Sequence, residues 1–97
     1  MASEYDSVKI RTLAREIGQV AEKVAEVDGN TIRTIRQELP GNFTGSAADA
    51  LTQSVEELSQ DVRSISSGLR EVQNALLALA QRLEAADAAA KALINSR

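Results

Sequence analysis

Apolar residues recur along the second half of the chain in a strict heptad pattern. From Leu51 onward, the spacing alternates between four and three residues for six repeats without a break. These positions are Leu51, Val55, Leu58, Val62, Ile65, Leu69, Val72, Leu76, Leu79, Leu83, Ala86, Ala90 and Leu93. Such spacing keeps one face of an α-helix apolar, whereas a strand would require a period of two. The pattern therefore predicts one helix over residues 46–94, about 70 Å long.

The first half of the chain repeats this pattern more briefly and then changes register. Its apolar positions are Ile10, Leu13, Ile17, Val20, Val24 and Val27. The next large apolar residues, Ile32, Ile35 and Leu39, are displaced by one residue, which is about 100° of helix rotation. The displacement coincides with residues 28–30 (Asp-Gly-Asn), which are poor helix formers. We expect a helix over residues 4–38 with a kink or bulge here, and a true break is the alternative.

The residues between the two helices carry the signals of a tight reversal. Pro40 lacks an N–H and disfavours the α conformation at the residue before it, so we expect it to end the first helix. Gly41 and Gly45 supply the backbone freedom for a turn over residues 39–45. A connection this short makes the two helices antiparallel neighbours. The chain is therefore predicted to be one all-α domain over residues 1–97, an antiparallel helix-turn-helix hairpin.

Small residues border the apolar positions of the second helix. The e and g positions of the heptad, which often carry charged pairs in coiled coils, are mostly Ser, Ala and Gly, so a further helix can approach on either flank. We also expect the longer second helix to overhang the first at its C-terminal end. Two hairpins are then expected to pair into a four-helix bundle through Leu58, Ile65, Leu69, Leu76, Leu77 and Leu79. In the alternative, the small residues reflect only the helix propensity of an Ala-rich monomeric hairpin.

Composition argues against several classes of function. The chain has no Cys and no His, so the commonest metal ligands and catalytic bases are absent, and neither catalysis nor a cofactor is expected. A net charge of −3 with interspersed signs lacks the clustered basic face that nucleic acid requires. No apolar run approaches the roughly 18 residues of a membrane span. The first twenty residues also lack the apolar core of a cleaved secretory signal.

The turn resembles that of a known protein family. Phe43-Thr44-Gly45 and the Ala-rich segment after it are similar to the W-x-G turn of the small WXG-motif proteins, the early-secreted-antigen-like substrates and partners of bacterial type VII secretion. The resemblance covers nearly the whole chain, in length, central turn and two-helix architecture. Phe43 replaces the motif Trp and keeps a large apolar ring without the indole N–H. Leu83 and Asp87 fall where many members carry a Y-x-x-x-D/E export signal, with Leu83 in place of the Tyr.

This resemblance implies a small non-catalytic protein that is assembled in the bacterial cytoplasm and secreted by the type VII route without a cleaved signal peptide. It would act as an exported dimer with itself or a homologous hairpin, or as a targeting partner for a larger secreted effector and the secretion ATPase. The missing Tyr implies that a partner supplies the export signal. The alternatives are a generic intracellular coiled-coil adaptor with a similar turn and, more weakly, an amphipathic protein of the membrane surface.

The residues that resemble the family's turn and export signal can also be explained by ordinary structural roles. Phe43 is either a plug for the open end of the hairpin or a recognition residue, and Gly45 is a backbone position that tolerates no Cβ. Asp87 lies four residues before Lys91, so a solvated i,i+4 ion pair competes with a degenerate export signal. Gly45 and Leu83 are about 57 Å apart on one helix, so a composite recognition site would require an antiparallel pair of hairpins.

Overall fold

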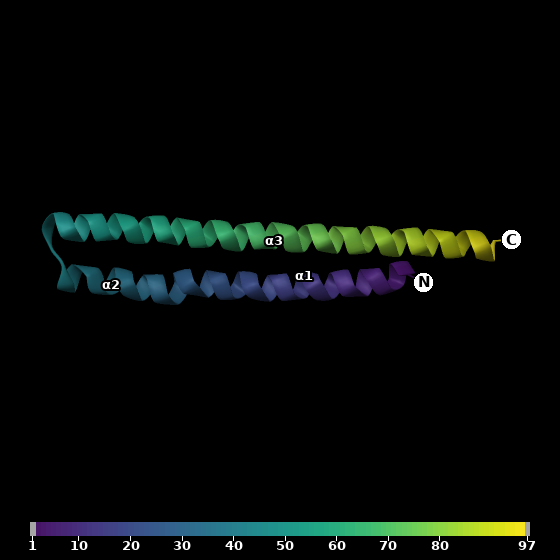
Figure 1. Ribbon diagram of the computed structural model, residues 1–97, viewed down its shortest axis with the longest axis horizontal. Helices are drawn as coiled ribbons and strands as arrows, with labels where there is room; N and C mark the ends of the chain where they lie inside the picture. The colour runs from purple at the N-terminus through teal and green to yellow at the C-terminus, as the bar shows by residue number, and fades with distance from the viewer. Residues whose placement is uncertain (1, 97) are drawn as a thin grey trace. The chain divides into compact units, whose positions relative to one another are not determined.

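The chain folds into two helices joined by a short turn. The structure is a computed structural model that describes residues 2–96, with side chains from residue 5 onward. The elements are α1 (Ala2–Glu26), the π-helical segment η1 (Val27–Ile32), α2 (Arg33–Asn42) and α3 (Gly45–Asn95), shown in Figure 1. Residues 2–96 contain no strand. The predicted all-α architecture of two helices is therefore confirmed.

Contacts divide the chain into two compact units. The first unit joins α1 up to Gln19 with α3 from Arg70 onward, and the second is the continuous segment Val20–Leu69. The second unit therefore contains the end of α1, η1, α2, the turn and the first half of α3.

Within each unit the two helical segments run in opposite directions. In the first unit, Gly18 lies against Gln73, and Arg11, seven residues earlier in α1, bonds to Glu84, eleven residues later in α3. The second unit behaves in the same way, since the contacts of α1, η1 and α2 move back along α3 as residue numbers rise. Each unit thus has the antiparallel hairpin arrangement that the short connection predicted.

The change of register in the first helix is a π-helical turn and not a break. η1 spans six residues, and the residues on either side, Glu26 (φ −62°, ψ −30°) and Arg33 (φ −60°, ψ −42°), keep helical backbone angles. A π-turn accommodates one extra residue within an α-helix, which is the size of the displacement in the apolar pattern. Ile32 consequently returns to the buried side and is 0% exposed. The predicted bulge at residues 28–30 is confirmed.

The expectation that Pro40 ends the first helix is wrong. Pro40 lies inside α2, which continues to Asn42, so the non-helical connection is reduced to Phe43 and Thr44. Close to the end of a helix, the missing proline N–H costs one hydrogen bond only. The last turn is completed by the Phe43 N–H, which donates to the Leu39 carbonyl at 3.0 Å, and by the Asn42 side chain, which donates to the Glu38 carbonyl at 2.8 Å.

Small residues form much of the line along which the helices touch, which we call the hairpin seam. In the first unit its buried residues are Ser7, Ala14, Gly18, Ala80 and Asp87. In the second unit they are Ala21, Ile32, Leu39, Ser59 and Val62. A Cβ built on Gly18 would lie 2.3 Å from Gln73 Nε2, so the amide of Gln73 occupies the space that a side chain would need there. Small side chains allow two helices to pack closely, and in α3 the e positions of the heptad provide most of them.

Candidate interaction surface

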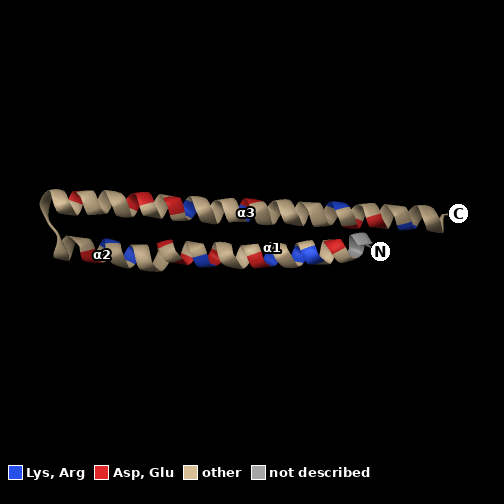
Figure 2. Ribbon diagram, viewed as in Figure 1, with Lys and Arg blue, Asp and Glu red and all other residues tan. Residues whose placement is uncertain are grey.

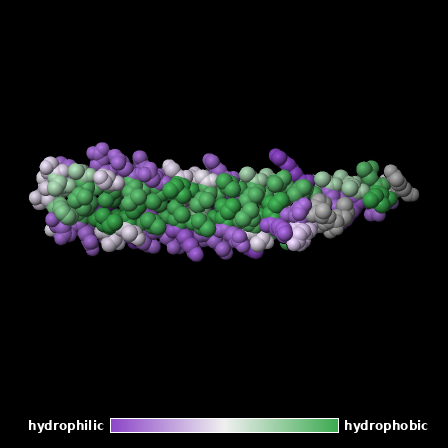
Figure 3. All heavy atoms as spheres, viewed as in Figure 1, coloured by the Kyte–Doolittle hydropathy of each residue, from purple (hydrophilic) through white to green (hydrophobic). Residues whose placement is uncertain are grey.

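A row of large apolar side chains remains exposed beside the hairpin seam, and we call it the apolar stripe. In the first unit it consists of Leu13, Val72, Leu79 and Leu93. In the second unit it consists of Val20, Val27, Ile35, Leu51, Leu58 and Ile65. These side chains are between 37% and 69% exposed, and Figure 3 shows apolar surface over one face of each unit. Contiguous apolar surface bordered by polar residues is typical of interaction sites.

The helical geometry of α3 explains why these residues are exposed. Each stripe residue of the repeat comes one residue before a seam position, as Leu58 does before Ser59 and Leu79 before Ala80. One residue is about 100° of rotation, so the stripe faces sideways while the seam faces the other helix. The e flank of α3 is therefore occupied by the chain's own first helix, and the d positions remain available to a partner.

Ion pairs occupy the other flank of the hairpin seam. In the first unit, Arg11 Nε and Nη2 donate to both carboxylate oxygens of Glu84 at 2.8 and 2.6 Å. In the second unit, Arg36 Nε and Nη2 donate to the two oxygens of Glu56 at 2.5 and 3.1 Å. Hydrogen bonds from Arg11 lower the pKa of Glu84. Both acids are five residues after a stripe residue of α3, about 140° around the helix, so these charges lie away from the stripe.

Charges of both signs are interspersed along the helices of each unit, as Figure 2 shows. This distribution agrees with the sequence, which has no clustered basic face. The interhelical ion pairs are consequently distributed along the chain rather than gathered at one site.

A polar cluster ties the π-segment to α3 in the second unit. Asp28 accepts hydrogen bonds from Ser59 Oγ and, at 3.0 Å, from Arg63 Nε. Ser59 is 1% exposed and the side chain of Asp28 is 18% exposed. The hydrogen bond from Ser59, followed by that from Arg63, lowers the pKa of the Asp28 carboxyl group. The carboxylate thereby holds the extra residue of η1 against the second helix.

We expect this cluster to make folding stability fall in acid. Because the pKa of Asp28 is lower in the folded chain, its stabilisation is complete above the unfolded value of about 3.9 and is lost as the pH falls through the folded value. Asp28→Asn removes this titration, so its free energy of unfolding should fall less steeply below about pH 4. Urea unfolding at a series of pH values measures the difference. Glu71→Gln, at an exposed acid outside the cluster, is the control and should keep the wild-type slope, whereas equal slopes for Asp28→Asn and wild type would contradict the expectation.

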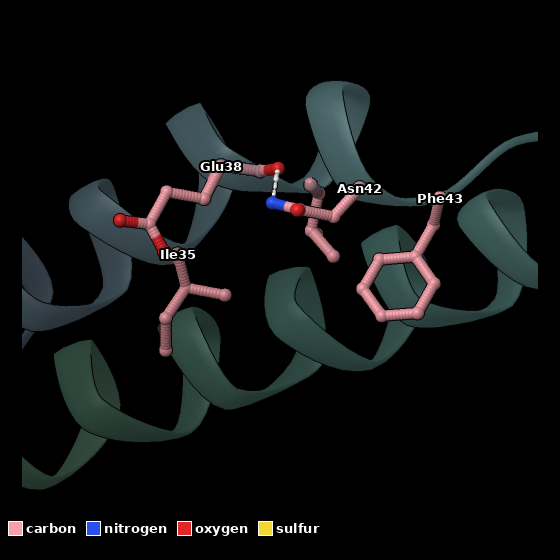
Figure 4. Close-up of a pocket in the computed structure, with 5 residues that line it drawn as sticks. Ile35, Glu38, Asn42 and Phe43 are labelled. Carbon is pink, nitrogen blue, oxygen red and sulfur yellow. Dashed lines mark hydrogen bonds between the residues drawn. The ribbon is translucent and has the colours of Figure 1, made fainter.

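Phe43 forms the turn together with Thr44 and lies partly exposed. It has an extended backbone (φ −138°, ψ 147°) and is 45% exposed. Its ring borders an open hollow of about 140 Å³, shown in Figure 4, whose lining residues are Ile35, Glu38, Leu39, Asn42 and Phe43. An exposed aromatic ring beside a hollow fits a contact with another molecule as well as it fits a plug.

Gly45 begins α3 and has φ +65°, a left-handed conformation that glycine adopts without strain. No atom lies within 4 Å of a Cβ built at this position. A side chain at this position would be strained by the backbone conformation and not by crowding, which agrees with the expectation of a backbone position that requires glycine.

The predicted interface residues divide into two groups. Three of them, Leu58, Ile65 and Leu79, lie on the apolar stripe. The other three, Leu69, Leu76 and Leu77, are half-buried. The expectation that Leu76, Leu77 and Leu79 lie in an overhanging end of α3 is wrong. Arg11 of α1 lies beside Glu84, which comes later in α3 than these three leucines. Leu76 and Leu77 therefore lie alongside α1 in the first unit.

The first helix contributes stripe residues that the sequence interpretation did not select. Leu13, Val20 and Val27 are 46%, 48% and 42% exposed. These three residues are spaced by seven, as the stripe residues of α3 are. Once the d positions of α3 are known to be exposed, the same spacing in α1 identifies Leu13, Val20 and Val27 as stripe residues.

Asp87 is buried, which corrects the expectation of a solvated acid. Its side chain is 5% exposed, and its Oδ2 lies 3.4 Å from Lys91 Nζ, so the expected i,i+4 ion pair is present. Leu83, one helical turn earlier, is half-buried. Asp87 occupies an e position of the heptad, as Ser59 and Ala80 do. This position places Asp87 on the hairpin seam of the first unit.

The described part of the chain has neither a cluster of metal-ligating side chains nor a helix suited to crossing a membrane. Among these residues, no group of three or more His, Cys, Asp and Glu is placed to hold a metal ion. None of the described helices is long and apolar enough to cross a membrane.

Comparison with known proteins identifies the family. The model of the WXG100 family, described as proteins of 100 residues with WXG, matches residues 3–88. This range contains η1, α2, the turn and most of α1 and α3. Searches of curated proteins and of solved structures find no significant match. Because the matched range covers most of the chain and includes the Phe43-Thr44-Gly45 turn, the chain belongs to the WXG100 family.

Proposed function

We propose that this chain is a helical subunit of bacterial type VII secretion that pairs through its apolar stripe and travels as a dimer or as the targeting partner of a larger effector. Membership of the WXG100 family makes it a small helical protein associated with type VII secretion. Proteins of this family are secreted and typically pair with themselves or with homologous partners. The apolar stripe is the observation that carries the proposal, because an unpaired hairpin would leave it in water.

Pairing stripe to stripe would complete a four-helix bundle. A large aliphatic side chain gains about 1.5–3 kcal/mol on full burial, so a half-exposed one gains about half as much when a partner covers it. Association costs roughly 4–15 kcal/mol, which means that many such side chains must be covered together. The regular spacing of the stripe along both helices favours a partner that is itself a long helical hairpin.

The turn is the stronger candidate for recognition by the secretion machinery. Phe43 presents an exposed ring, whereas the carboxylate of Asp87 is buried and Leu83 lacks the hydroxyl of a tyrosine. An antiparallel pair of hairpins would bring the turn of one beside the α3 end of the other. The partner, or the effector that it carries, would then supply the export signal that Leu83 does not provide.

Replacing Phe43 by alanine tests the proposed recognition. We expect the variant to keep its helical circular dichroism and its pairing, while export from a host with a type VII system falls by roughly tenfold or more, as for the loss of an aromatic anchor. Tyr5→Ala removes an exposed aromatic residue far from the turn in sequence and should leave export unchanged. Loss of helical structure in Phe43→Ala would make Phe43 a plug and contradict its role in recognition.

Co-purification tests the proposed pairing. The chain, tagged and expressed with homologous hairpins or with an effector, should elute as a stable complex whose mass is measured by light scattering. A chain that remains a monomer of 10.4 kDa under all these conditions would contradict the proposal.

A further inference from the structure

We propose that the hollow beside Phe43 is a binding site for an arginine side chain of a different polypeptide. This inference rests on the proposed function, in which the turn is recognised by a secretion partner, and adds the chemistry of the group that meets it. The hollow and every residue that lines it belong to the second unit, so the site is complete within that unit of a single chain.

The two ends of the hollow differ in chemistry. Its lining residues Ile35, Glu38, Leu39 and Asn42 are spaced as i, i+3, i+4 and i+7, so they share one face of α2. Figure 4 shows Glu38 beside Ile35 at one end and the Phe43 ring at the other, with Asn42 between them. Glu38 and Asn42 are four residues apart, about 6 Å along the helix axis. A ligand that reaches from the ring to the carboxylate is therefore an extended one.

The rim of the hollow offers a carboxylate and an amide oxygen as acceptors. None of the described side chains forms an ion pair or a hydrogen bond with the Glu38 carboxylate. Arg36, two residues earlier, is already bonded to Glu56. Asn42 uses its Nδ2 to donate to the Glu38 carbonyl at 2.8 Å, which leaves its Oδ1 as an acceptor. The rim therefore suits a positively charged ligand with several donors.

The rest of the lining is apolar. Ile35 and Phe43 are 37% and 45% exposed, so both can contact a ligand. An acidic ligand would meet the Glu38 carboxylate with like charge, and a purely apolar one would remove water from it without replacing the hydrogen bonds. A side chain with a methylene stem and a cationic head suits both ends, because the stem covers apolar surface while the head stays at polar groups.

Arginine fits this site better than lysine. Its planar guanidinium carries five N–H donors in a fixed fork, which can bond both carboxylate oxygens of Glu38 and still donate to Oδ1 of Asn42. The face of an aromatic ring such as that of Phe43 also attracts a guanidinium group. Lysine presents a strongly hydrated point charge on a flexible stem. The site should consequently select arginine over lysine.

The single phenylalanine of the chain allows binding to be followed at one ring. Incorporation of 4-fluorophenylalanine labels Phe43 alone, and its fluorine resonance is recorded while a peptide is added. The probe is the peptide acetyl-Ala-Ala-Arg-Ala-Ala-amide, which should bind saturably with a Kd in the roughly millimolar range, as for one side chain on a small surface. A resonance that does not move as this peptide is added would overturn the inference.

Two matched peptides test the chemistry of the ligand. Citrulline has nearly the shape of arginine without its charge, so a peptide with citrulline in place of arginine should bind roughly tenfold more weakly. A peptide with lysine at the same place should bind roughly threefold more weakly. If the citrulline peptide binds as well as the arginine peptide, the site does not recognise a cation. If the lysine peptide does so, the assignment to arginine is wrong.

Glu38→Gln tests the carboxylate while keeping the size of the side chain. It should weaken binding of the arginine peptide by roughly tenfold. Glu26→Gln makes the same change of charge at an exposed acid of α1 outside the hollow and should bind as the wild type does. Both variants should keep their helical circular dichroism, because both side chains are exposed. Equal binding by Glu38→Gln and the wild type would overturn the site.

The same two variants connect the site with secretion. In a host with a type VII system, export of Glu38→Gln should fall several-fold, whereas export of Glu26→Gln should not change. Equal export of Glu38→Gln and the wild type would contradict an arginine on the secretion partner. A fluorine resonance that moves with the concentration of the chain alone, but not in Glu38→Gln, would assign the hollow to a second copy and overturn the inference.

The outcomes separate this inference from the proposed function. Failure of the arginine peptide to bind overturns the inference, while the proposed function still stands on co-purification and on the export of Phe43→Ala. A chain that binds the arginine peptide selectively but pairs with nothing contradicts the proposed function, and the arginine site remains.

Discussion

Replacing Ile32 by alanine is expected to lower the free energy of unfolding by about 2–4 kcal/mol. Ile32 is 0% exposed and is the bulkiest of the fully buried side chains in the described part of the chain. Alanine loses the transfer free energy of the missing carbon atoms and leaves a cavity in a narrow contact where little else can move. Urea unfolding followed by circular dichroism, at protein concentrations low enough to keep hairpins apart, measures the change.

Ile35→Ala is the matched control for this prediction. Ile35 lies three residues further along the same helix and is 37% exposed, so its truncation should cost about 1 kcal/mol or less in the unpaired hairpin. If the two variants lose the same free energy of unfolding, Ile32 is not buried at the hairpin seam and the π-segment does not place it there.

Replacing Ile65 by aspartate is expected to weaken pairing by roughly a hundredfold or more while leaving the hairpin helical. Ile65 is 55% exposed on the apolar stripe, so the hairpin itself tolerates a carboxylate there. In the paired state this charge would be buried without a partner, which typically costs about 3–5 kcal/mol. Sedimentation or light scattering over a range of concentrations measures the association.

Ser67→Asp controls for the added charge. Ser67 is exposed on the same helix, two residues after Ile65 and about 200° around it, away from the stripe. This variant should pair as the wild type does. A dimer that survives Ile65→Asp would show that pairing uses another surface.

The heptad pattern predicted the helices because apolar spacing reports directly on which face avoids water. The pattern could not tell whether the a positions or the d positions are buried within the hairpin, because residues such as Val62 (a) and Ile65 (d) are similar in size and polarity. The small residues decide this, since Ser59 and Ala80 let the first helix approach on their side of α3. The stripe was therefore visible in the sequence, but its separation from the seam was not.

The misplaced residues share a physical cause. Asp87 looked like a surface acid by residue type, yet it is placed on the seam by its position relative to Ala80, seven residues earlier. Pro40 looked like a helix end, yet near a terminus the helix has few hydrogen bonds left to lose. In both cases the position in the fold outweighed the ordinary preference of the residue.

The polar cluster at Asp28 had no sequence signal. Its partners Ser59 and Arg63 are 31 and 35 residues away and are ordinary helix residues when considered alone. Local patterns describe which way a helix faces, but contacts between distant side chains depend on how the two helices are aligned along each other. Only the register change at residues 28–30 indicated that something unusual occurs there.

The π-segment has a consequence for comparing this chain with its relatives. A relative whose first helix is α-helical throughout needs one residue fewer than residues 27–32 to keep the same side chains packed against the second helix. This difference in length falls inside a helix, where there is no loop. An ungapped alignment through this segment would match core positions on one side of it with surface positions of the relative. A one-residue gap inside a continuous helix, usually treated as an alignment error, is here the physically correct choice.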